Sequence, residues 1–329
     1  MPAHAHSGSG TTSLGTLPLP RWTGSSVLVA PPGDGAGCWA GAPSAVMVRG
    51  IVYLAYRLRR PLGAGRGVIN VVARSADGVA FETVATVGKE RFDADSLERP
   101  ALAVTPEGRW RLYVSAATPG TKHWRVEMLE AAEPFGLAEA PAVTVLPGDS
   151  GHAVKDPVLW YENGTGDGPG RWHLWASCHP LDPPEHADRM ETRYATSPDG
   201  VSWTWDGTAL AGRPGTWDSR GTRVSWVLPV GDELLASYDG RASAAENWEE
   251  RTGTARGGRL PDGRYGQLAA DPAGPTGSPY PPGGLRYLCV LQLPGGGYRL
   301  YYEATRPDGA HELRTELAAR PEEGTPEPG

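Results

Sequence analysis

The sequence predicts an all-β fold, a single-domain five-bladed β-propeller built from four-stranded antiparallel blades. Composition is the first observation: 45 Gly and 32 Pro occur beside 12 Trp and 12 Tyr in 329 residues, which is typical of short strands joined by tight turns. The second is a repeat in which a Gly is followed, four residues later, by a Leu within an apolar or aromatic run. The Leu-to-Leu spacings are 58, 62, 61 and 65 residues, a period that indicates a repeat architecture. The five pairs are Gly50/Leu54, Gly108/Leu112, Gly170/Leu174, Gly231/Leu235 and Gly296/Leu300.

Each repeat predicts a β-hairpin followed by further strands. A strand, a Gly-bearing turn and a second strand form a hairpin signature. Asp-Gly turns at Asp77 and Asp199 lie 122 residues apart, which is two periods. Apolar runs precede the five Gly/Leu pairs at residues 45–48, 101–104, 158–161, 224–230 and 285–293. Third strands are expected at residues 68–74, 124–130 and 193–196.

The two ends of the chain are expected to meet in the ring. The fifth repeat runs out of strand after residues 312–317, so the early segment 26–30 is predicted to complete the fifth blade. The propeller then spans residues 21–317, with disordered tails at 1–20 and 318–329. The Gly- and Pro-rich stretch 257–282 predicts a long loop between the fourth and fifth blades. A pair of β-sandwiches is the competing fold, although it does not require the period.

Charge and hydropathy exclude several classes of partner. The net charge is −7 and the sequence contains no basic block, so a nucleic-acid partner is not expected. No apolar run is long enough to span a bilayer, and no signal peptide is evident, so we predict a cytoplasmic protein without a membrane partner. Cys38, Cys178 and Cys289 lie far apart, and their spacing favours reduced, buried thiols over a disulfide or zinc site.

Two strand starts carry a charged pair directly before a proline: Glu98-Arg99-Pro100 and Lys155-Asp156-Pro157. Proline holds the preceding residue extended, so Asp156 is predicted to lie extended at the mouth of a strand. In a propeller the first strand of every blade lines the central channel. We therefore expect these charged starts to face one cavity. The ends of the second strands are expected to add Arg57, Ser115, His179, Asp239, Arg241 and Glu303.

Acid–base catalysis by a pair of carboxyl groups needs one that is protonated and one that is ionised. Carboxylates that share a cavity push their pKa values apart, and neighbouring cations lower one of them selectively. We predict Asp156 and Glu98 as the catalytic carboxylates, with Asp218 or Asp239 as a third. The expected substrate-binding residues are Trp39, Arg99, His152, Lys155, His179, Trp217, Arg220, Arg223 and Asp239.

Each of these residues could instead have a purely structural role. Asp156 could cap a turn, and Glu98 could be an exposed partner of Arg99. Asp218 and Arg220 could form a structural ion pair. A histidine near aromatic residues is often a hydrogen-bonded wall residue, and the same reading applies to His152 and His179. Asp239 lies in a Tyr-Asp-Gly turn, which alone would explain the carboxylate.

The five repeats, with Glu98-Arg99-Pro100 opening the second and Lys155-Asp156-Pro157 the third, resemble the five-bladed glycoside hydrolases of the family 43/32 type. They also resemble the glycoside phosphorylases of family 130. The resemblance to family 43 implies an inverting mechanism with an Asp base on blade one, a pKa-tuning carboxylate and a Glu acid. The sequence departs from that pattern because blade one opens with residues 41–44, Gly-Ala-Pro-Ser, which carry no carboxylate. Asp34 is a candidate substitute.

These observations predict a glycosidase-like enzyme that acts on a small-molecule glycoside or a sugar-like compound. The missing carboxylate supports a second hypothesis, a non-catalytic propeller that binds a sugar or a protein. A third is a propeller recruited to acid–base chemistry in secondary metabolism. No metal-ligand spacing is present, so no metal or other cofactor is predicted, and a single cation in the channel is left open.

Overall fold

The structure is a computed structural model that describes residues 17–164 and 169–319. Within these residues the fold is all-β, with short 3-10 turns and no α-helix. Three sheets are antiparallel and four-stranded, and each follows the chain order of its strands. Their strands are β6 (Leu97–Val104), β7 (Trp110–Ala117), β8 (Trp124–Ala131) and β9 (Ala142–Leu146); β10 (His152–Glu162), β11 (Arg171–Pro180), β12 (Glu191–Ser197) and β13 (Thr204–Leu210); and β14 (Gly221–Val230), β15 (Glu233–Arg241), β16 (Arg251–Gly258) and β17 (Ala269–Ala270).

The remaining strands form one mixed sheet of eight, which joins the two ends of the chain. Its strands are β1 (Ser26–Val29), β2 (Trp39–Val48), β3 (Ile51–Arg59), β4 (Gly67–Ser75), β5 (Glu82–Gly88), β18 (Leu285–Gln292), β19 (Tyr298–Thr305) and β20 (His311–Ala318). The set β2–β5 meets the set β18–β20 at one parallel pair, Trp39 with His311. β1 pairs antiparallel with β20, which confirms the predicted closing strand at 26–30. The 3-10 turns are η1 (Leu62–Ala64), η2 (Lys89–Phe92), η3 (Pro134–Ala138), η4 (Pro184–His186) and η5 (Ala244–Glu246).

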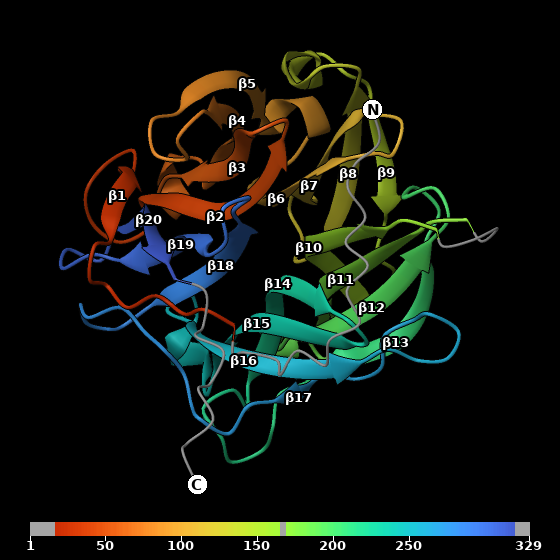
Figure 1. Ribbon diagram of the computed structural model, residues 1–329. Helices are drawn as coiled ribbons and strands as arrows, with labels where there is room; N and C mark the ends of the chain where they lie inside the picture. The colour runs from red at the N-terminus through yellow and green to blue at the C-terminus, as the bar shows by residue number, and fades with distance from the viewer. Residues whose placement is uncertain (1–16, 165–168, 320–329) are drawn as a thin grey trace, which may run out of the picture.

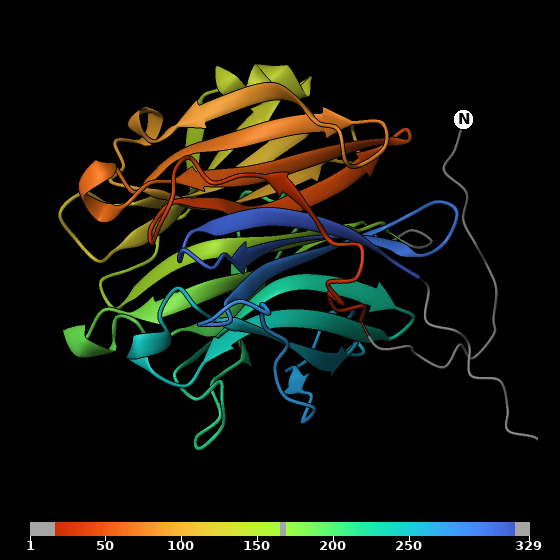
Figure 2. The ribbon, with the colours of Figure 1, turned by 90° about the vertical axis from the view of Figure 1, so that its left-hand side faces the viewer.

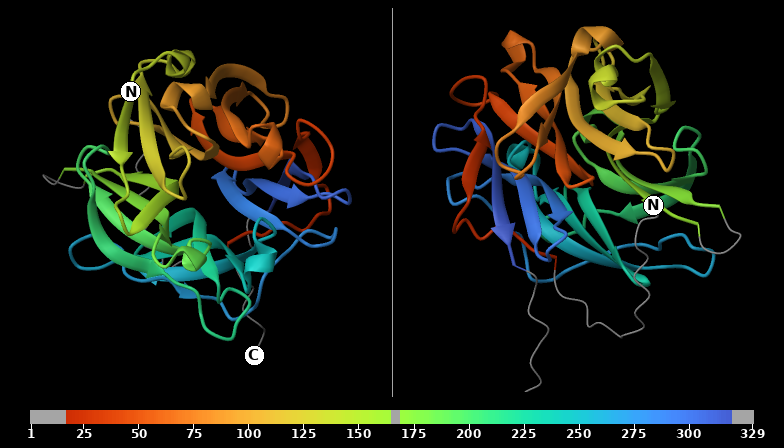
Figure 3. Two further views of the ribbon diagram at one scale, coloured as in Figure 1. Left: turned by 180° about the vertical axis from the view of Figure 1, so that it is seen from behind. Right: turned by 45° about the horizontal axis from the view of Figure 1, so that its top comes forward.

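The sheets are arranged around a common centre (Figure 1, and from behind in Figure 3, left). β2 contacts β6, β6 contacts β10, β10 contacts β14, β14 contacts β18, and β18 contacts β2. These five strands, which we call the inner strands, therefore form a closed ring. In Figure 2 the C-terminal strands, in blue, lie between the red-orange N-terminal strands and the teal sheet of β14–β17.

Every inner strand is bulged where it passes the centre. The register shifts fall between Gly41 and Ser44, Leu97 and Pro100, Lys155 and Val158, Val224 and Trp226, and Arg286 and Cys289. The expectation that Asp156 is extended is wrong, because its φ is 54°. The bulge places Asp156 in the left-handed region of backbone conformation, which costs a non-glycine residue conformational free energy. Bulges of this kind are common next to functional sites. Ala42 and Tyr287 have the same sign of φ, at 54° and 56°.

The two Asp-Gly turns are confirmed and have the same hydrogen bonds. In one, Asp77 Oδ1 accepts from the backbone N–H groups of Val79 and Ala80. In the other, Asp199 Oδ1 accepts from the two equivalent N–H groups, also at 2.8 Å. This identity across two repeats shows that local sequence alone specified the turn.

Apolar side chains fill the spaces between neighbouring sheets. Trp110 packs between the set β2–β5 and the sheet β6–β9, and Trp172 packs between the sheets β6–β9 and β10–β13, as expected of core residues at repeat positions. The three cysteines are free and buried, as predicted. Most of the two tails expected at residues 1–20 and 318–329 lies outside the described residues. Within the described part, Leu17 packs against β18 and β19 residues, and Ala318 is the last residue of β20. Among the residues described, no helix is long and apolar enough to cross a membrane.

Candidate active site in the central cavity

A cavity of about 280 Å³ lies where the inner strands begin. Each inner strand contributes at least one lining residue from its first few positions: Trp39, Glu98, Lys155, Arg223, and both Arg286 and Tyr287. The starts of these strands therefore face one cavity, as the sequence pattern predicted. Loops add further polar and aromatic residues to the wall: Arg66, Lys122, Asp188, Asn247, Trp248 and Glu250.

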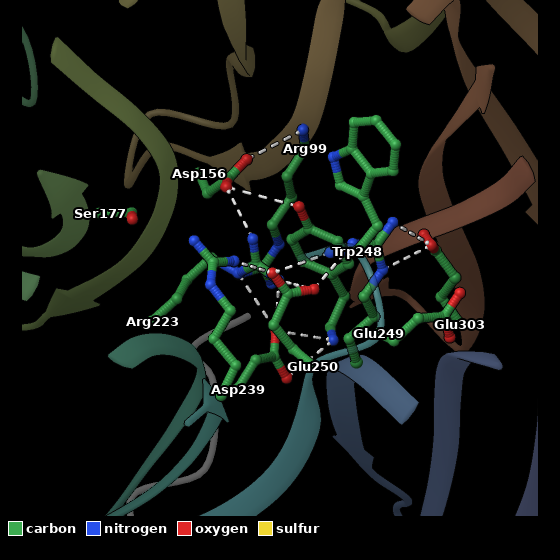
Figure 4. Close-up of polar contacts among 12 residues, drawn as sticks. Arg99, Asp156, Ser177, Arg223, Asp239, Trp248, Glu249, Glu250 and Glu303 are labelled. Atoms are coloured by element: carbon green, nitrogen blue, oxygen red, sulfur yellow. Dashed lines mark hydrogen bonds and ion pairs between the residues drawn. The ribbon is translucent and has the colours of Figure 1, made fainter. Parts of the chain in front are cut away.

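A buried network in which carboxylates alternate with arginines forms part of this wall and extends behind it (Figure 4). Arg223 is its central member. Its Nε and Nη2 donate to Asp239 Oδ2 at 3.1 and 2.9 Å, and its Nη1 donates to Asp156 Oδ2 at 3.3 Å. Its guanidinium also lies 3.9 Å from the centre of the Tyr287 ring. Two carboxylates from different sheets thus share one cation.

Glu98 lies at the cavity wall and is nearly buried. Arg57 donates to Glu98 Oε2, and Arg59 donates to Oε1 at 3.2 Å. The alternative that Glu98 is an exposed partner of Arg99 is therefore wrong, because Glu98 is buried and its partners are Arg57 and Arg59. Glu98 is instead a carboxylate held by two guanidinium groups from β3, with one face toward the cavity.

Asp156 is fully buried and is not among the residues that line the cavity. Its carboxylate accepts from Arg99 N at 3.2 Å and lies 3.7 Å from Lys155 Nζ. Although burial opposes ionisation, Lys155 and Arg223 hold the pKa of Asp156 below its usual value. Asp156 therefore contacts the cavity wall from behind, through the lining residues Lys155 and Arg223.

Two further carboxyl groups of the network, those of Asp239 and Glu250, have pKa values shifted in opposite directions. Burial raises the pKa of Asp239 to about 6, against the opposing effects of Arg223 and Tyr287 N. Glu250 lines the cavity and is bound by Arg241 and Arg286. These cations outweigh its burial and keep its pKa well below the usual range. Glu250 was not predicted from the sequence.

Lys155 lines the cavity beside His179. Burial is the main cause that lowers the pKa of Lys155 to about 8, while Asp156 acts in the opposite direction. Its Nζ lies 4.9 Å from the centre of the Trp124 ring. A lysine with a pKa this close to neutrality can both hold and release a proton.

His179 is predicted to stay neutral throughout the physiological range. Burial, followed by Lys155 and Arg241, lowers its pKa to about 3. A depressed pKa stabilises the fold above about pH 6.5, and this contribution is lost as the pH falls from 6.5 toward 3. In an NMR titration the ring signals of His179 should not move between pH 5 and 7, below the range in which its neighbour Lys155 loses its proton. His179→Gln should lose less stability than the wild type between pH 7 and pH 4. A titration midpoint near pH 6.5 would contradict the prediction.

The aromatic wall has a covered part and an open part. Trp39 stacks on His311 with 4.8 Å between ring centres, and the guanidinium of Arg59 lies 4.0 Å from its ring centre. Its faces are occupied by the protein, and it is 2% exposed. Trp248 meets Trp39 edge-on and is 39% exposed. Of these two, Trp248 is therefore the one with surface free for a ligand.

Residues 41–44 of β2 carry no carboxylate, but a carboxylate from another strand lies beside them. Glu303, on β19, lies against the backbone of Gly41 and binds Arg57, Arg286 and His311. A side chain at position 41 would overlap with the Glu303 carboxylate. Glu303 is fully buried and is not among the residues that line the cavity. Asp34 lies instead on the exposed surface, beside Arg306.

Gly41→Ala is expected to lower the free energy of unfolding by about 1–3 kcal/mol, because its new methyl group would displace Glu303 from a pinned position. Gly258→Ala is the matched control. Position 258 also lies in a strand, but a Cβ there would meet nothing within 4 Å. Urea unfolding of both variants checks the difference. Equal stability of the two variants would show that Glu303 can move freely.

The remaining predicted residues are dispersed. Asp218 and Trp217 lie outside the cavity wall; Asp218 binds Arg213 and Tyr238, and Trp217 stacks on Tyr238. His152 and Arg220 line a second pocket of about 340 Å³, which shares Met190 with the central cavity. Arg220 also binds the cavity residue Asp188. The alternative pairing of Asp218 with Arg220 is therefore not what the structure contains.

Several lining residues were not predicted. Arg286 and Tyr287 occupy, on β18, the bulge that Lys155 and Asp156 occupy on β10, and extending the repeat to the fifth blade could have found them. Trp248 lies in an irregular loop with φ 78°, and nothing in the period marks it. Within residues 17–164 and 169–319, no group of three or more His, Cys, Asp or Glu is placed to hold a metal.

Comparison with known proteins supports the fold and no more. No family model matches the sequence, and no curated protein matches it significantly. Among solved structures, the chain is similar to a GH43_1 enzyme from Xanthomonas citri complexed with xylotriose, at 16% identity and TM-score 0.62, covering 91% of this chain and 92% of the other. A glycosyl hydrolase from Bacteroides ovatus shows 14% identity and TM-score 0.62, with 92% and 98% covered.

A third similar structure comes from the GH130 family of mannoside phosphorylases, which contains glycoside hydrolases. It shows 15% identity and TM-score 0.59, with 94% of this chain and 100% of the other covered. The resemblance to propeller enzymes of families 43 and 130 is therefore confirmed at the level of the fold. The architecture is that of propeller glycoside hydrolases and their relatives.

Proposed function

We propose that this chain is a carbohydrate-active enzyme that hydrolyses a glycoside, or a sugar-like small molecule, in the central cavity of a five-bladed propeller. The blade count rests on treating the eight-stranded sheet as two blades. Its two sets of strands meet at a single residue pair, and five bulged inner strands form the ring. β1 completes the fifth blade by pairing with β20.

The observation that carries the proposal is the cavity itself. Five strand starts, distant in sequence, bring a carboxylate, a lysine and arginines into one space beside the open ring of Trp248. Sugar sites combine aromatic surface with a few fixed polar groups in this way. The likeness in fold to several glycoside hydrolases supports the same class of ligand.

Within this proposal the chemistry divides between Glu98 and Lys155. Glu98, held by Arg57 and Arg59, is the ionised group that orients water or stabilises positive charge at the anomeric carbon. Lys155, with a pKa of about 8, is protonated at neutral pH and can donate to the leaving oxygen. Asp156 lies 3.7 Å from Lys155 Nζ and stabilises its protonated form. Of the two residues predicted as catalytic carboxylates, Glu98 keeps that role in this proposal, whereas Asp156, which does not line the cavity, becomes a positioning residue.

A second candidate is a propeller that binds a sugar without cleaving it. One observation favours it: Glu98 and Glu250 are paired with arginines, and Asp188 is paired with Arg220. Despite partial or full burial, Arg220 holds the pKa of Asp188 below its usual value, and Arg241 and Arg286 do the same for Glu250. Neither of these two carboxyl groups is therefore poised as a carboxylic acid. Hydrolysis then depends on Lys155 as the proton donor.

A panel of aryl glycosides and oligosaccharides, assayed for release of reducing sugar, tests the proposal. Turnover that depends on Glu98 would support hydrolysis. Binding of panel members, measured by calorimetry without any turnover, would overturn hydrolysis and favour the second candidate. Neither turnover nor binding would overturn both.

A further inference from the structure

The cavity wall carries more positive than negative charge. Seven of its residues are cationic, namely Arg59, Arg66, Lys122, Lys155, Arg223, Arg241 and Arg286, and three are carboxylates, namely Glu98, Asp188 and Glu250. A wall of this composition with low-dielectric surroundings raises the local concentration of anions.

The carboxylates do not offset this excess, because each is already bound. Glu98 holds Arg57 and Arg59, and Asp188 binds Arg220 through both oxygens, at 2.7 and 2.9 Å. Glu250 binds Arg241 and Arg286. Arg223 and Lys155 in turn face Asp156. Each of these lining cations and carboxylates thus already has an oppositely charged partner within the protein.

Two lining cations remain outside this set of pairs. In the described part of the chain, Arg66 and Lys122 form no ion pair, and Arg66 Nε is buried without a hydrogen-bond partner. Asp95 is the carboxylate whose charge raises the pKa of Arg66, against the lowering effect of burial. It lies beyond ion-pair distance from Arg66 and accepts a hydrogen bond from Gly120 N. A buried donor without a partner calls for a ligand or an ordered solvent molecule.

The local backbone holds Arg66 in place. Its φ is 60°, its N–H donates to Pro61 O, and its own carbonyl accepts from Arg60 N. A left-handed, non-glycine residue is strained, and such strain concentrates at functional positions. The guanidinium lies 5.8 Å from the ring centre of Trp124, which also lines the cavity, and Lys122 is two residues from that ring in sequence.

We propose that Arg66, Lys122 and Trp124 form a subsite for an anionic substituent, a carboxylate or a phosphate, on the sugar that the cavity binds. This inference rests on the proposed function, because it names the class of sugar. The ring of the sugar lies against the aromatic wall, and its anionic group lies between the two cations.

Calorimetric titration with matched pairs of ligands tests the subsite. The pairs are methyl glucuronide with methyl glucoside, methyl galacturonide with methyl galactoside, and glucose 6-phosphate with glucose; inorganic phosphate is added alone. At least one anionic member should bind about tenfold more tightly than its neutral partner or more. The carboxylate and phosphate arms identify which group the subsite prefers. Binding of inorganic phosphate alone would place the recognition in the anion rather than in the ring.

The preference should fall to within about threefold in Arg66→Met/Lys122→Met. Arg74→Met/Arg264→Met is the matched control, because it removes the same charge from two exposed arginines that do not line the cavity. Lys122 is exposed, so Lys122→Glu tests the site without relying on the double variant. Because it places a negative charge in the subsite, it should weaken anion binding more than loss of the positive charge alone.

Three results would overturn the inference: neutral members that bind as tightly as anionic ones, a preference that survives both cavity variants, or no binding of any anionic probe. Turnover of a neutral glycoside without an anionic preference would leave the proposed function standing and remove only the inference. Tight binding of an anionic sugar that is never cleaved would leave the inference standing and overturn hydrolysis as the proposed function.

Discussion

Glu98→Gln is expected to lower turnover by about 100-fold or more, because the substitution removes the charge of the one predicted carboxylate that faces the cavity. Loss of a group acting in the transition state typically costs this much. The amide keeps the shape of the side chain and can still accept from Arg57 or Arg59. Arg57 also retains its bond to Glu303. The fold should therefore lose only about 1–3 kcal/mol of stability, and kcat measured on folded protein checks the prediction.

Glu127→Gln is the matched control. Glu127 is a nearly buried glutamate in the sheet β6–β9, where it binds Arg125 and Thr144, and it does not line the cavity. Its variant should retain full turnover. If Glu98→Gln and Glu127→Gln retain equal activity, Glu98 is a structural residue and the mechanism proposed above is wrong.

Arg223→Met is expected to lower the free energy of unfolding by about 3–5 kcal/mol, because it leaves two buried carboxylates without their shared cation. Arg223 bonds directly to Asp156 and Asp239, and it lies 4.0 Å from Glu250. Methionine fills much of the same volume, so the loss reports on charge more than on packing. Arg74→Met is the control. It breaks an exposed pair with Glu82 and should cost about 0–1 kcal/mol.

The deficit of Arg223→Met should shrink as the pH falls. Without the guanidinium, the pKa values of Asp156 and Asp239 rise in the folded state, so the folded variant takes up protons that the unfolded chain still lacks. Such groups stabilise the fold at low pH, and that stability is lost as the pH rises through their folded pKa. Urea unfolding at pH 5 and pH 8 measures the difference. A deficit that grows at pH 5 would show that the two carboxylates do not carry the effect.

Much of the fold could be predicted because its signals are local. The Gly/Leu pairs mark hairpins that form between neighbouring strands, and the turns at Asp77 and Asp199 are made by residues within a few positions. The closing strand at 26–30 followed from the missing strand of the last repeat. The bulges did not follow, because a proline predicts an extended predecessor and Asp156 lies instead in the left-handed region.

The site divides in the same way. Glu98, Lys155 and Arg223 were found because they stand at strand starts, which the period locates. Trp217 and Asp218 stand just before such a start, yet they pack against Tyr238 rather than facing the cavity. Trp248 comes from a loop that no repeat describes. Position along the strand was predictable, but the direction of each side chain near a bulge was not.

The sequence by itself determined the repeat, the hairpins and the gathering of charged strand starts at one end of the ring, since each depends on neighbours in the chain. Only the tertiary structure decided which of those charges reach solvent and which neutralise one another. Arg57 meets Glu303 across 246 residues, and Arg223 meets Asp156 across 67. Such pairs depend on ring closure and on five bulges, because ion pairs form over a few ångströms that no spacing along the chain can specify.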